Sequence, residues 1–338
     1  MRFNKTFQAI DTHTGGQPTR ILTGLFPTIP GETMDEKRRY MVEHKDDIRQ
    51  LLCEEPRGHK SMYCALMTEP VNPEAKVGVI FMSSVTYDNM CGHGTIGLVT
   101  ALLETGLINL DNDEGGSELV IDTPSGPLTT YPQLQDGEVK SVSFQGVPSF
   151  VYEKDIELEV DEYGVVKGDL AFGGNWYFYV NAKDLNTKVQ PEKVSSLLKK
   201  GNKIKEAVVN KYQFNHPTRD SIRNELTGVS IYQHPQETIT EQKNIVVESK
   251  FFYDRSPCGT GTCGRMAILS SSGQLNKGDA FLNKSITGSV FRGEVIGKTK
   301  VGTHEAIKPK ITGQAYITGF NQFVVDPKDP LKEGFLYY

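Results

Sequence analysis

Apolar residues along the chain recur in two patterns, short runs with strand character and longer segments with helical spacing. Residues 7–22 predict two strands joined by a glycine-rich turn, and residues 34–52, which are rich in charge, predict a helix. A strongly apolar strand is predicted at 77–82, followed by a helix at 96–104 that Gly106 ends. The first half therefore contains strands followed by an apolar helix.

The second half repeats this order of elements. Residues 141–144, 175–180 and 245–247 have the β-branched and aromatic character of strands. A lysine-rich helix is predicted at 191–211, and an apolar helix at 263–272 follows the last of these strands.

Two segments almost half the chain apart share the same order of motifs and predicted elements. Tyr87–Thr95 and Tyr253–Thr262 both read strand, Tyr-Asp, a short linker, Cys-Gly-x-Gly-Thr and helix. Chance could match one short motif, but it is much less able to match the flanking elements as well. We infer an internal duplication that gives two lobes of like topology, and we expect the site in the cleft between them.

Composition describes an ordinary globular protein and excludes some partners. Of its residues, 37% are hydrophobic and 23% are charged. The length of 338 residues is more than one hydrophobic core usually holds, which predicts two lobes or domains. A net charge of −5 argues against nucleic acid as a partner. The basic residues at 199–205 are best explained as a solvated helix face.

Nothing in the sequence predicts a membrane or secretory protein. The first residues lack the apolar core of a signal peptide, and no stretch reaches the ~18 apolar residues of a membrane span. We therefore expect no membrane partner and a cytoplasmic location. The sequence allows a homodimer.

The cysteines are free thiols in this interpretation. Five are present, an odd number without Cys-x-x-Cys spacing, which argues against a disulfide framework and a four-thiolate zinc site. Cys53, Cys64 and Cys263 are expected to be buried packing residues. The matched turns single out Cys91 and Cys258.

Each cysteine turn can activate a sulfur and hold an anion. A helix N-terminus carries unpaired N–H groups and a partial positive charge, which lower a thiol pKa and bind carboxylates. Glycines leave these N–H groups uncovered. Two such turns suit inversion of a stereocentre, which needs a base on one face of the carbon and an acid on the other. This scheme needs neither a metal nor a cofactor.

Other readings of the turns explain less. The lysine and spacing of a Walker phosphate loop are missing. A zinc site from Cys91, His93 and Cys258 lacks a convincing fourth ligand, and a cysteine hydrolase leaves the second turn unexplained. A redox pair would abolish the proposed base. A non-catalytic binder of cyclic amino acids remains an alternative.

Three nearby residues have open roles. His93 is either a structural histidine or a substrate contact, and Asp254 is either a turn cap or the partner of a substrate ammonium. Turn chemistry is enough to explain His13.

Motifs across nearly the whole chain resemble the proline racemase family. This family includes proline racemases, 4-hydroxyproline 2-epimerases and trans-3-hydroxyproline dehydratases. The matching segments are Asp11–Gly16, Glu55–His59, Met90–Gly97, Phe172–Trp176 and Asp254–Thr262.

The resemblance implies an α+β fold like that of diaminopimelate epimerase, with two pseudo-symmetric lobes. Each lobe would be a curved, mostly antiparallel sheet wrapped around a central helix. It places the first lobe at 1–126, with a tail at about 315–338 returning to it, and the second at 127–314.

The resemblance also implies roles for the site residues. Cys91 and Cys258 would be the acid/base pair. Gly92, His93, Gly259 and Thr260 would contact the substrate carboxylate through their turns, and Asp254 would hold the amine.

The ring substituent of the substrate is harder to predict. Dehydratases of this family carry threonine in place of Cys258, which favours inversion here. Residues 173–178 and 14–16 resemble 4-hydroxyproline epimerases, whereas 315–321 resemble proline racemases. Gly228 stands where many hydroxyproline epimerases carry a substrate-contacting histidine. We expect epimerisation of trans-4-hydroxy-L-proline to cis-4-hydroxy-D-proline, with proline racemisation as the alternative.

A last departure lies just after the second cysteine turn. Residues 263–265 read Cys-Gly-Arg where Ser-Ala-Lys is usual in the family.

Overall fold

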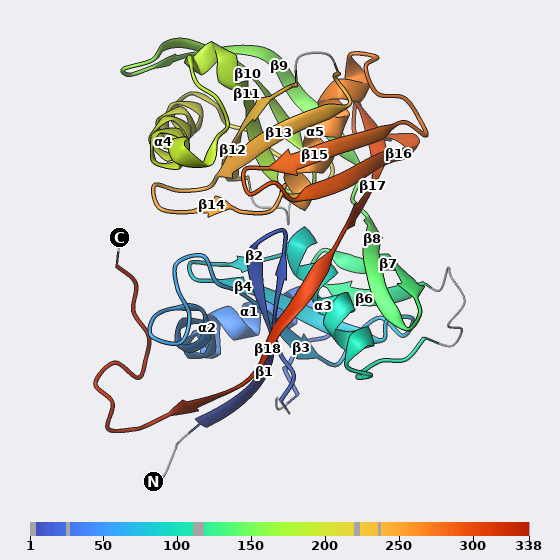
Figure 1. The fold of residues 1–338 in the computed structure, drawn as a ribbon, viewed down its shortest axis with the longest axis vertical. Coiled ribbons are helices and arrows are strands. Elements are labelled where there is room, and N and C mark those ends of the chain that lie inside the picture. Colours follow the sequence, from blue (N-terminus) through green and yellow to red (C-terminus); the bar gives the residue numbers. More distant parts are fainter. Residues whose placement is uncertain (1–4, 25–27, 111–117, 220–223, 236–237, 338) are drawn as a thin grey trace. The chain divides into compact units, whose positions relative to one another are not determined.

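The chain forms two units, each built around one buried helix. The computed structural model describes residues 5–24, 28–110, 118–219, 224–235 and 238–337. Unit 1 comprises Met1–Phe144 with Gly313–Tyr338, and unit 2 comprises Gln145–Thr312. Figure 1 follows both along the chain, with the C-terminal strand of unit 1 in red.

Unit 1 contains nine strands and three helices in its described part. They are β1 (Lys5–Thr14), β2 (Gln17–Leu22), α1 (Met34–His44), α2 (Asp46–Cys53), β3 (Tyr63–Thr68), β4 (Val77–Ser83), β5 (Tyr87–Asp88), α3 (Gly92–Glu104), β6 (Leu119–Thr123), β7 (Gly126–Gln135), β8 (Glu138–Gln145) and β18 (Ala315–Val325).

Unit 2 repeats this composition with one long outer helix. Its elements are β9 (Ser149–Val160), β10 (Gly164–Phe172), β11 (Trp176–Asn181), η1 (Ala182–Leu185), η2 (Pro191–Lys193), α4 (Val194–Lys211), β12 (Leu226–Gln233), β13 (Glu241–Val247), β14 (Tyr253–Asp254), α5 (Gly259–Ser271), β15 (Ala280–Ser285), β16 (Val290–Val301) and β17 (His304–Gly313).

The two units share one strand topology. In unit 1, β2 runs parallel to β3, which pairs antiparallel with β4, and β4 in turn pairs antiparallel with β5 and parallel with β6. In unit 2, β11, β12, β13, β14 and β15 make the same sequence of pairings. Even the short strands match, because Asp88 pairs with Phe81 and Asp254 pairs with Val246. The predicted α+β class and the pseudo-symmetry of the two lobes are confirmed.

The first unit ends later in the chain than residue 126, where the sequence placed it. The hairpin of β7 and β8 continues the sheet from β6 through antiparallel pairing, which adds residues up to Phe144 to this unit. The C-terminal strand β18 pairs along the whole length of β1, so the tail does return to unit 1.

The central helices α3 and α5 are rich in apolar and small residues, and Arg265 of α5 is their one charged side chain within the buried turns. Gly92–Leu102 and Gly259–Leu269 are buried throughout, as expected of largely apolar helices inside a protein. Helix α3 contacts strands β1, β2 and β18, and helix α5 contacts strands β9, β10 and β16. A Cβ atom at Gly97 would lie 2.6 Å from Thr12 Oγ1, so glycine lets the sheet close around the helix.

These two helices begin earlier than the sequence predicted. The expected starts at 96 and 263 are wrong, because helical structure begins at Gly92 and Gly259, directly after each cysteine. The Cys-Gly-x-Gly-Thr segment is therefore the first turn of the helix itself.

The outer helices cover the opposite face of each sheet. The expected single helix at 34–52 is two, because Lys45 leaves helical geometry with φ −139° and ψ 23°. Asp46 and Asp47 then open α2, where acidic side chains favour a helix start. In the described part of the chain, no helix combines the length and apolar character needed to cross a bilayer.

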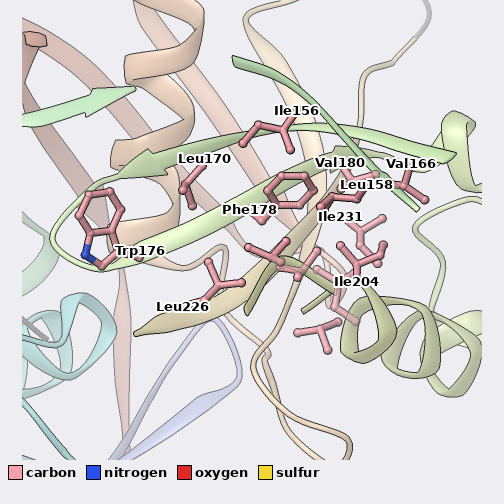
Figure 2. Packing of buried hydrophobic residues seen from close by; sticks show 14 of the residues in the cluster. Ile156, Leu158, Val166, Leu170, Trp176, Phe178, Val180, Ile204, Leu226 and Ile231 are labelled. Carbon is pink, nitrogen blue, oxygen red and sulfur yellow. The ribbon is translucent and has the colours of Figure 1, made fainter. Parts of the chain in front are cut away.

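The core of unit 2 lies between its sheet and α4. Figure 2 shows Trp176, Phe178 and Val180 of β11 in the same apolar cluster as Ile204 of α4. Because side chains alternate along a strand, Tyr177 and Tyr179 point to the opposite face and pack beside Cys258 and Ile268 of α5. One strand thus supports both the core and the cysteine turn.

Candidate active site

Cys91 and Cys258 occupy equivalent positions at the N-caps of α3 and α5. Cys91 is 6% exposed and Cys258 is 4% exposed. Each is preceded by the short Tyr-Asp strand of its own unit.

The threonine of each motif holds the carbonyl of its cysteine. The Thr95 N–H and hydroxyl both donate to Cys91 O, at 2.9 and 2.8 Å. The Thr262 N–H and hydroxyl donate in the same way to Cys258 O, at 2.8 and 2.6 Å. Two donors on one carbonyl hold the backbone of the cysteine in place, and therefore also the Cα atom from which its side chain extends.

The second glycine of each motif leaves room for the sulfur. A Cβ at Gly94 would lie 3.1 Å from Cys91 Sγ, and a Cβ at Gly261 would lie 3.0 Å from Cys258 Sγ. Both distances are shorter than an ordinary van der Waals contact, so a side chain at either glycine would crowd the sulfur. The Cys-Gly-x-Gly-Thr spacing is thus explained by contacts at the cysteine.

Both helix starts present unpaired backbone donors. The first N–H groups of a helix have no intrahelical acceptor. Within the described part of the chain, the N–H groups of Gly92, His93, Gly259 and Thr260 make no hydrogen bond. Buried N–H groups are rarely left in this state, and they suit an anionic group such as a carboxylate.

The two sulfur atoms differ in their immediate contacts. Cys91 has extended backbone with φ −135°, and its Sγ lies 3.4 Å from His93 Nδ1. Cys258 has φ 66°, a left-handed conformation that is costly for a side chain with a Cβ. Its Sγ accepts a hydrogen bond from the Gly261 N–H at 3.3 Å. Strain of this kind persists where the surrounding structure enforces it.

His93 is a neutral neighbour of Cys91. The histidine is 5% exposed, and its ring meets the Tyr63 ring edge-on at 4.7 Å between centroids. Burial lowers the pKa of His93 to about 3, so the ring carries no charge at neutral pH. A neutral ring has one N–H group. This group can donate a hydrogen bond to a thiolate while keeping its proton.

The buried ring makes stability depend on pH. The unfolded chain binds a proton on His93 at its ordinary pKa, whereas the folded chain does so only near pH 3. The contribution of neutral His93 to the free energy of unfolding is therefore fully present above pH 6.5. It is lost as the pH falls, by at most about 1.4 kcal/mol per pH unit. The free energy of unfolding, measured by urea titration between pH 5 and 6.5, should change less with pH for His93→Gln than for the wild type. The exposed His44→Gln variant should keep the wild-type pH dependence, and an unchanged pH dependence in His93→Gln would contradict the assignment.

Cys258 is held as a thiol, contrary to the lowered pKa expected for a helix N-terminus. Burial raises the pKa of Cys258 well above its ordinary value, and the Asp254 charge raises it further. The contacts with the Tyr177 hydroxyl and with the Gly261 N–H lower the pKa, in the opposite direction. Desolvation outweighs the helix terminus here, so Cys258 is a proton donor in the ligand-free protein.

Asp254 ends β14 beside this thiol. Its Oδ1 accepts a hydrogen bond from the Ser256 N–H at 2.8 Å, as a turn cap would. Burial raises the pKa of Asp254 to about 6. A buried carboxylate of this kind gains from a cation placed next to it.

Removing the Asp254 charge should make Cys258 more reactive. Asp254→Asn keeps the hydrogen-bond acceptor but removes a negative charge, which lowers the thiol pKa. At pH 8, alkylation of Cys258 by iodoacetamide should be severalfold faster than in the wild type, as measured by mass spectrometry of the labelled peptide. At pH 5, where Asp254 is mostly protonated, the two proteins should react alike. The exposed Asp161→Asn variant is the control, and equal rates at pH 8 would refute the coupling.

Tyr177 is the site residue that sequence reasoning missed. Its hydroxyl lies 3.5 Å from Cys258 Sγ and 2.9 Å from Thr260 Oγ1. The neighbouring Tyr179 hydroxyl donates to Gly261 O at 2.8 Å. Strand alternation at 176–180 could have shown that both tyrosines share the face opposite Trp176.

The remaining candidates have structural roles. His13 Nδ1 accepts from the Gly16 N–H at 3.2 Å, as turn chemistry predicted. Cys53, Cys64 and Cys263 are buried free thiols, in agreement with their expected packing role. Across the described ranges, no three His, Cys, Asp or Glu side chains are grouped as a metal site requires.

The predicted site residues thus form two groups. Cys91, Gly92 and His93 lie together at the start of α3 in unit 1. Asp254, Cys258, Gly259 and Thr260 lie together at β14 and the start of α5 in unit 2.

Comparison with known proteins shows the family of this chain. Residues 9–336 match the family model described as proline racemase. The chain belongs to the proline racemase family. A proline racemase of Clostridioides difficile is 41% identical over 336 residues, 99% of this chain and 99% of that protein. A trans-3-hydroxy-L-proline dehydratase of Bacillus cereus shows the same identity and coverage.

A solved structure extends the likeness to three dimensions. The hydroxyproline epimerase of Agrobacterium vitis, crystallised with bound trans-4-hydroxy-L-proline, has a TM-score of 0.92 at 29% identity. The match covers 100% of this chain and 96% of that chain. Membership in this family supports an isomerase that acts on a small molecule.

Proposed function

We propose that the protein inverts the α-carbon of a free proline-type amino acid, with Cys91 and Cys258 as the acid/base pair. The observation that carries this proposal is the equivalent placement of the two cysteines, each the N-cap of the central helix of its unit. A single catalytic cysteine would not require the second turn to keep the same carbonyl, glycine and sulfur contacts.

The proposed reaction moves one proton off the α-carbon and another onto its opposite face. One cysteine, as thiolate, accepts the α-proton, and the other, as thiol, donates its proton to the carbanionic carbon. The thiolate and the thiol have then exchanged, so the enzyme is ready for the opposite enantiomer. The raised pKa of Cys258 favours its thiol form in the resting protein, which suits the role of proton donor.

The backbone donors and Asp254 hold the substrate in this scheme. Charge that leaves the α-carbon develops on the substrate carboxylate, where the N–H groups of Gly92, His93, Gly259 and Thr260 stabilise it. Asp254 pairs with the substrate ammonium, which offsets the cost of the buried carboxylate. Tyr177 donates to Cys258 when that sulfur is a thiolate.

We propose trans-4-hydroxy-L-proline as the preferred substrate, with cis-4-hydroxy-D-proline as product. The motifs at 173–178 and 14–16 and the fold match to a hydroxyproline epimerase support this choice. Proline racemisation is the second candidate. It is favoured by the 41% identity to a proline racemase and by Gly228, where a Cβ would lie 2.7 Å from Val247 O. A histidine at that position would need a backbone shift.

A substrate panel with chiral chromatography tests the proposal. The enzyme is incubated separately with L-proline, trans-4-hydroxy-L-proline and trans-3-hydroxy-L-proline. The proposal predicts inversion without loss of water, fastest for the 4-hydroxy substrate. Faster inversion of proline would replace the substrate assignment but keep the reaction. Water loss from the 3-hydroxy substrate alone, or binding of all three without reaction, would refute the proposed function.

A further inference from the structure

A cavity in unit 2 contains none of the residues assigned above to the site. Its volume is about 410 Å³, and Arg265, Asp169, Tyr232, His234 and Ile268 line it. Arg265 belongs to the segment that departs from the usual family sequence. Because all of these residues lie in unit 2, the cavity is complete within one unit.

Arg265 is a buried cation fixed by neutral groups. Its side chain is 4% exposed, its Nε donates to Gln242 Oε1 at 3.0 Å, and its guanidinium carbon lies 3.9 Å above the Tyr232 ring. Its Nη2 lies 3.0 Å from His234 Nε2. The guanidinium therefore has a defined orientation but gains no counter-charge from these contacts.

His234 is neutral in this arrangement. Its Nδ1 lies 3.0 Å from the carbonyl oxygen of Glu241, which can only accept a hydrogen bond. The ring proton is therefore on Nδ1, and the lone pair of Nε2 accepts from Arg265. Burial lowers the pKa of His234, which keeps the ring in this form at neutral pH.

Carboxylates line the same cavity without reaching the guanidinium. Among the described residues, no carboxylate oxygen lies within the 4.0 Å of an ion pair from Arg265. Asp169 interacts with it electrostatically, but its Oδ1 accepts from the Asp155 N–H at 3.0 Å. The exposed Lys154 and Asp155 add one charge of each sign.

A zwitterion is the ligand that this arrangement fits. Opposite charges that are held apart in one cavity can each pair with one end of the same molecule. A planar guanidinium suits a carboxylate because two of its N–H groups can bind both oxygens, which the usual lysine cannot do. Ile268 and Ile239 supply an apolar wall. We propose that this cavity binds a free α-amino acid with an aliphatic side chain, its carboxylate on Arg265 and its ammonium at Asp169.

Calorimetric titration of the full chain with L-leucine tests this site. The matched ligands are 4-methylpentanoate, which lacks the ammonium, and 3-methylbutylamine, which lacks the carboxylate. L-Leucine should bind, and each analogue should bind at least about tenfold more weakly, because each loses one charge-assisted contact. Arg265→Gln and Asp169→Asn should each raise the Kd for L-leucine by at least about tenfold. Asp169→Asn keeps the acceptor for the Asp155 N–H, so it tests the site even if Arg265→Gln does not fold.

The control is Arg292→Gln, which removes an exposed arginine from β16 of the same unit. This variant should bind L-leucine as the wild type does. Absence of L-leucine binding to the wild type would overturn the proposal. Equal binding of the singly charged analogues, or wild-type affinity in both cavity variants, would also overturn it and would place any bound leucine elsewhere. These outcomes do not depend on the proposed inversion reaction.

Discussion

Cys91→Ser and Cys258→Ser are each expected to lower the rate of inversion by about 10²–10⁴-fold, the usual contribution of a general acid or base. A serine hydroxyl fits the cap position but cannot ionise at neutral pH. Because one face of the α-carbon then lacks its acid or base, loss of either sulfur slows inversion in both directions. Chiral chromatography of the product from each enantiomer measures this loss.

The matched control is Cys263→Ser. Cys263 is also a buried thiol of α5, but it lies past the first turn of the helix. This variant should invert substrate within about threefold of the wild type, since it removes no acid or base. Near-wild-type inversion by Cys91→Ser or Cys258→Ser would be incompatible with the two-thiol mechanism.

Gly173→Ala is expected to destabilise unit 2 by about 3 kcal/mol, the upper range for overpacking a filled core. A Cβ at Gly173 would lie 2.1 Å from Thr260 O and 2.4 Å from Gly264 N. Both are backbone atoms of the first turns of α5, so the helix start itself must move. Inversion should be lost together with stability.

Urea unfolding followed by tryptophan fluorescence measures this effect. Trp176 is the only tryptophan of the chain and is 1% exposed in the core of unit 2. Gly297→Ala is the control, because the nearest atom to a Cβ there is 3.6 Å away, an ordinary contact, and its effect should stay within about 0.5 kcal/mol. Equal stability of the two variants would show that α5 does not need the close approach at Gly173.

The sequence revealed the features of this protein that are periodic or repeated. The matched segments at 87–95 and 253–262 predicted the duplication, and strand pairing confirms it down to the two-residue strands. The buried strands and the apolar helices were predicted because their hydrophobic patterns are strong. The end of unit 1 was not, since β7 and β8 could belong to either sheet until their pairing with β6 is known.

The features that sequence reasoning missed depend on burial and on contacts between distant segments. The pattern at a helix N-terminus predicted a lowered thiol pKa, but desolvation around Cys258 has the larger effect. Tyr177 meets Cys258 only because β11 packs against α5. The break at Lys45 was hidden because helical spacing continues across it.

The fate of the α-hydrogen in heavy water distinguishes two catalytic thiols from one. L-Substrate is incubated with enzyme in ²H₂O, and both enantiomers are recovered at low conversion for NMR or mass spectrometry. With a separate acid on the far face, the D-product carries deuterium at the α-carbon while the remaining L-substrate keeps its protium, and the reverse holds from the D-side. Deuterium entering the recovered L-substrate as fast as the product forms would mean that a single group serves both faces, contrary to the paired roles of Cys91 and Cys258.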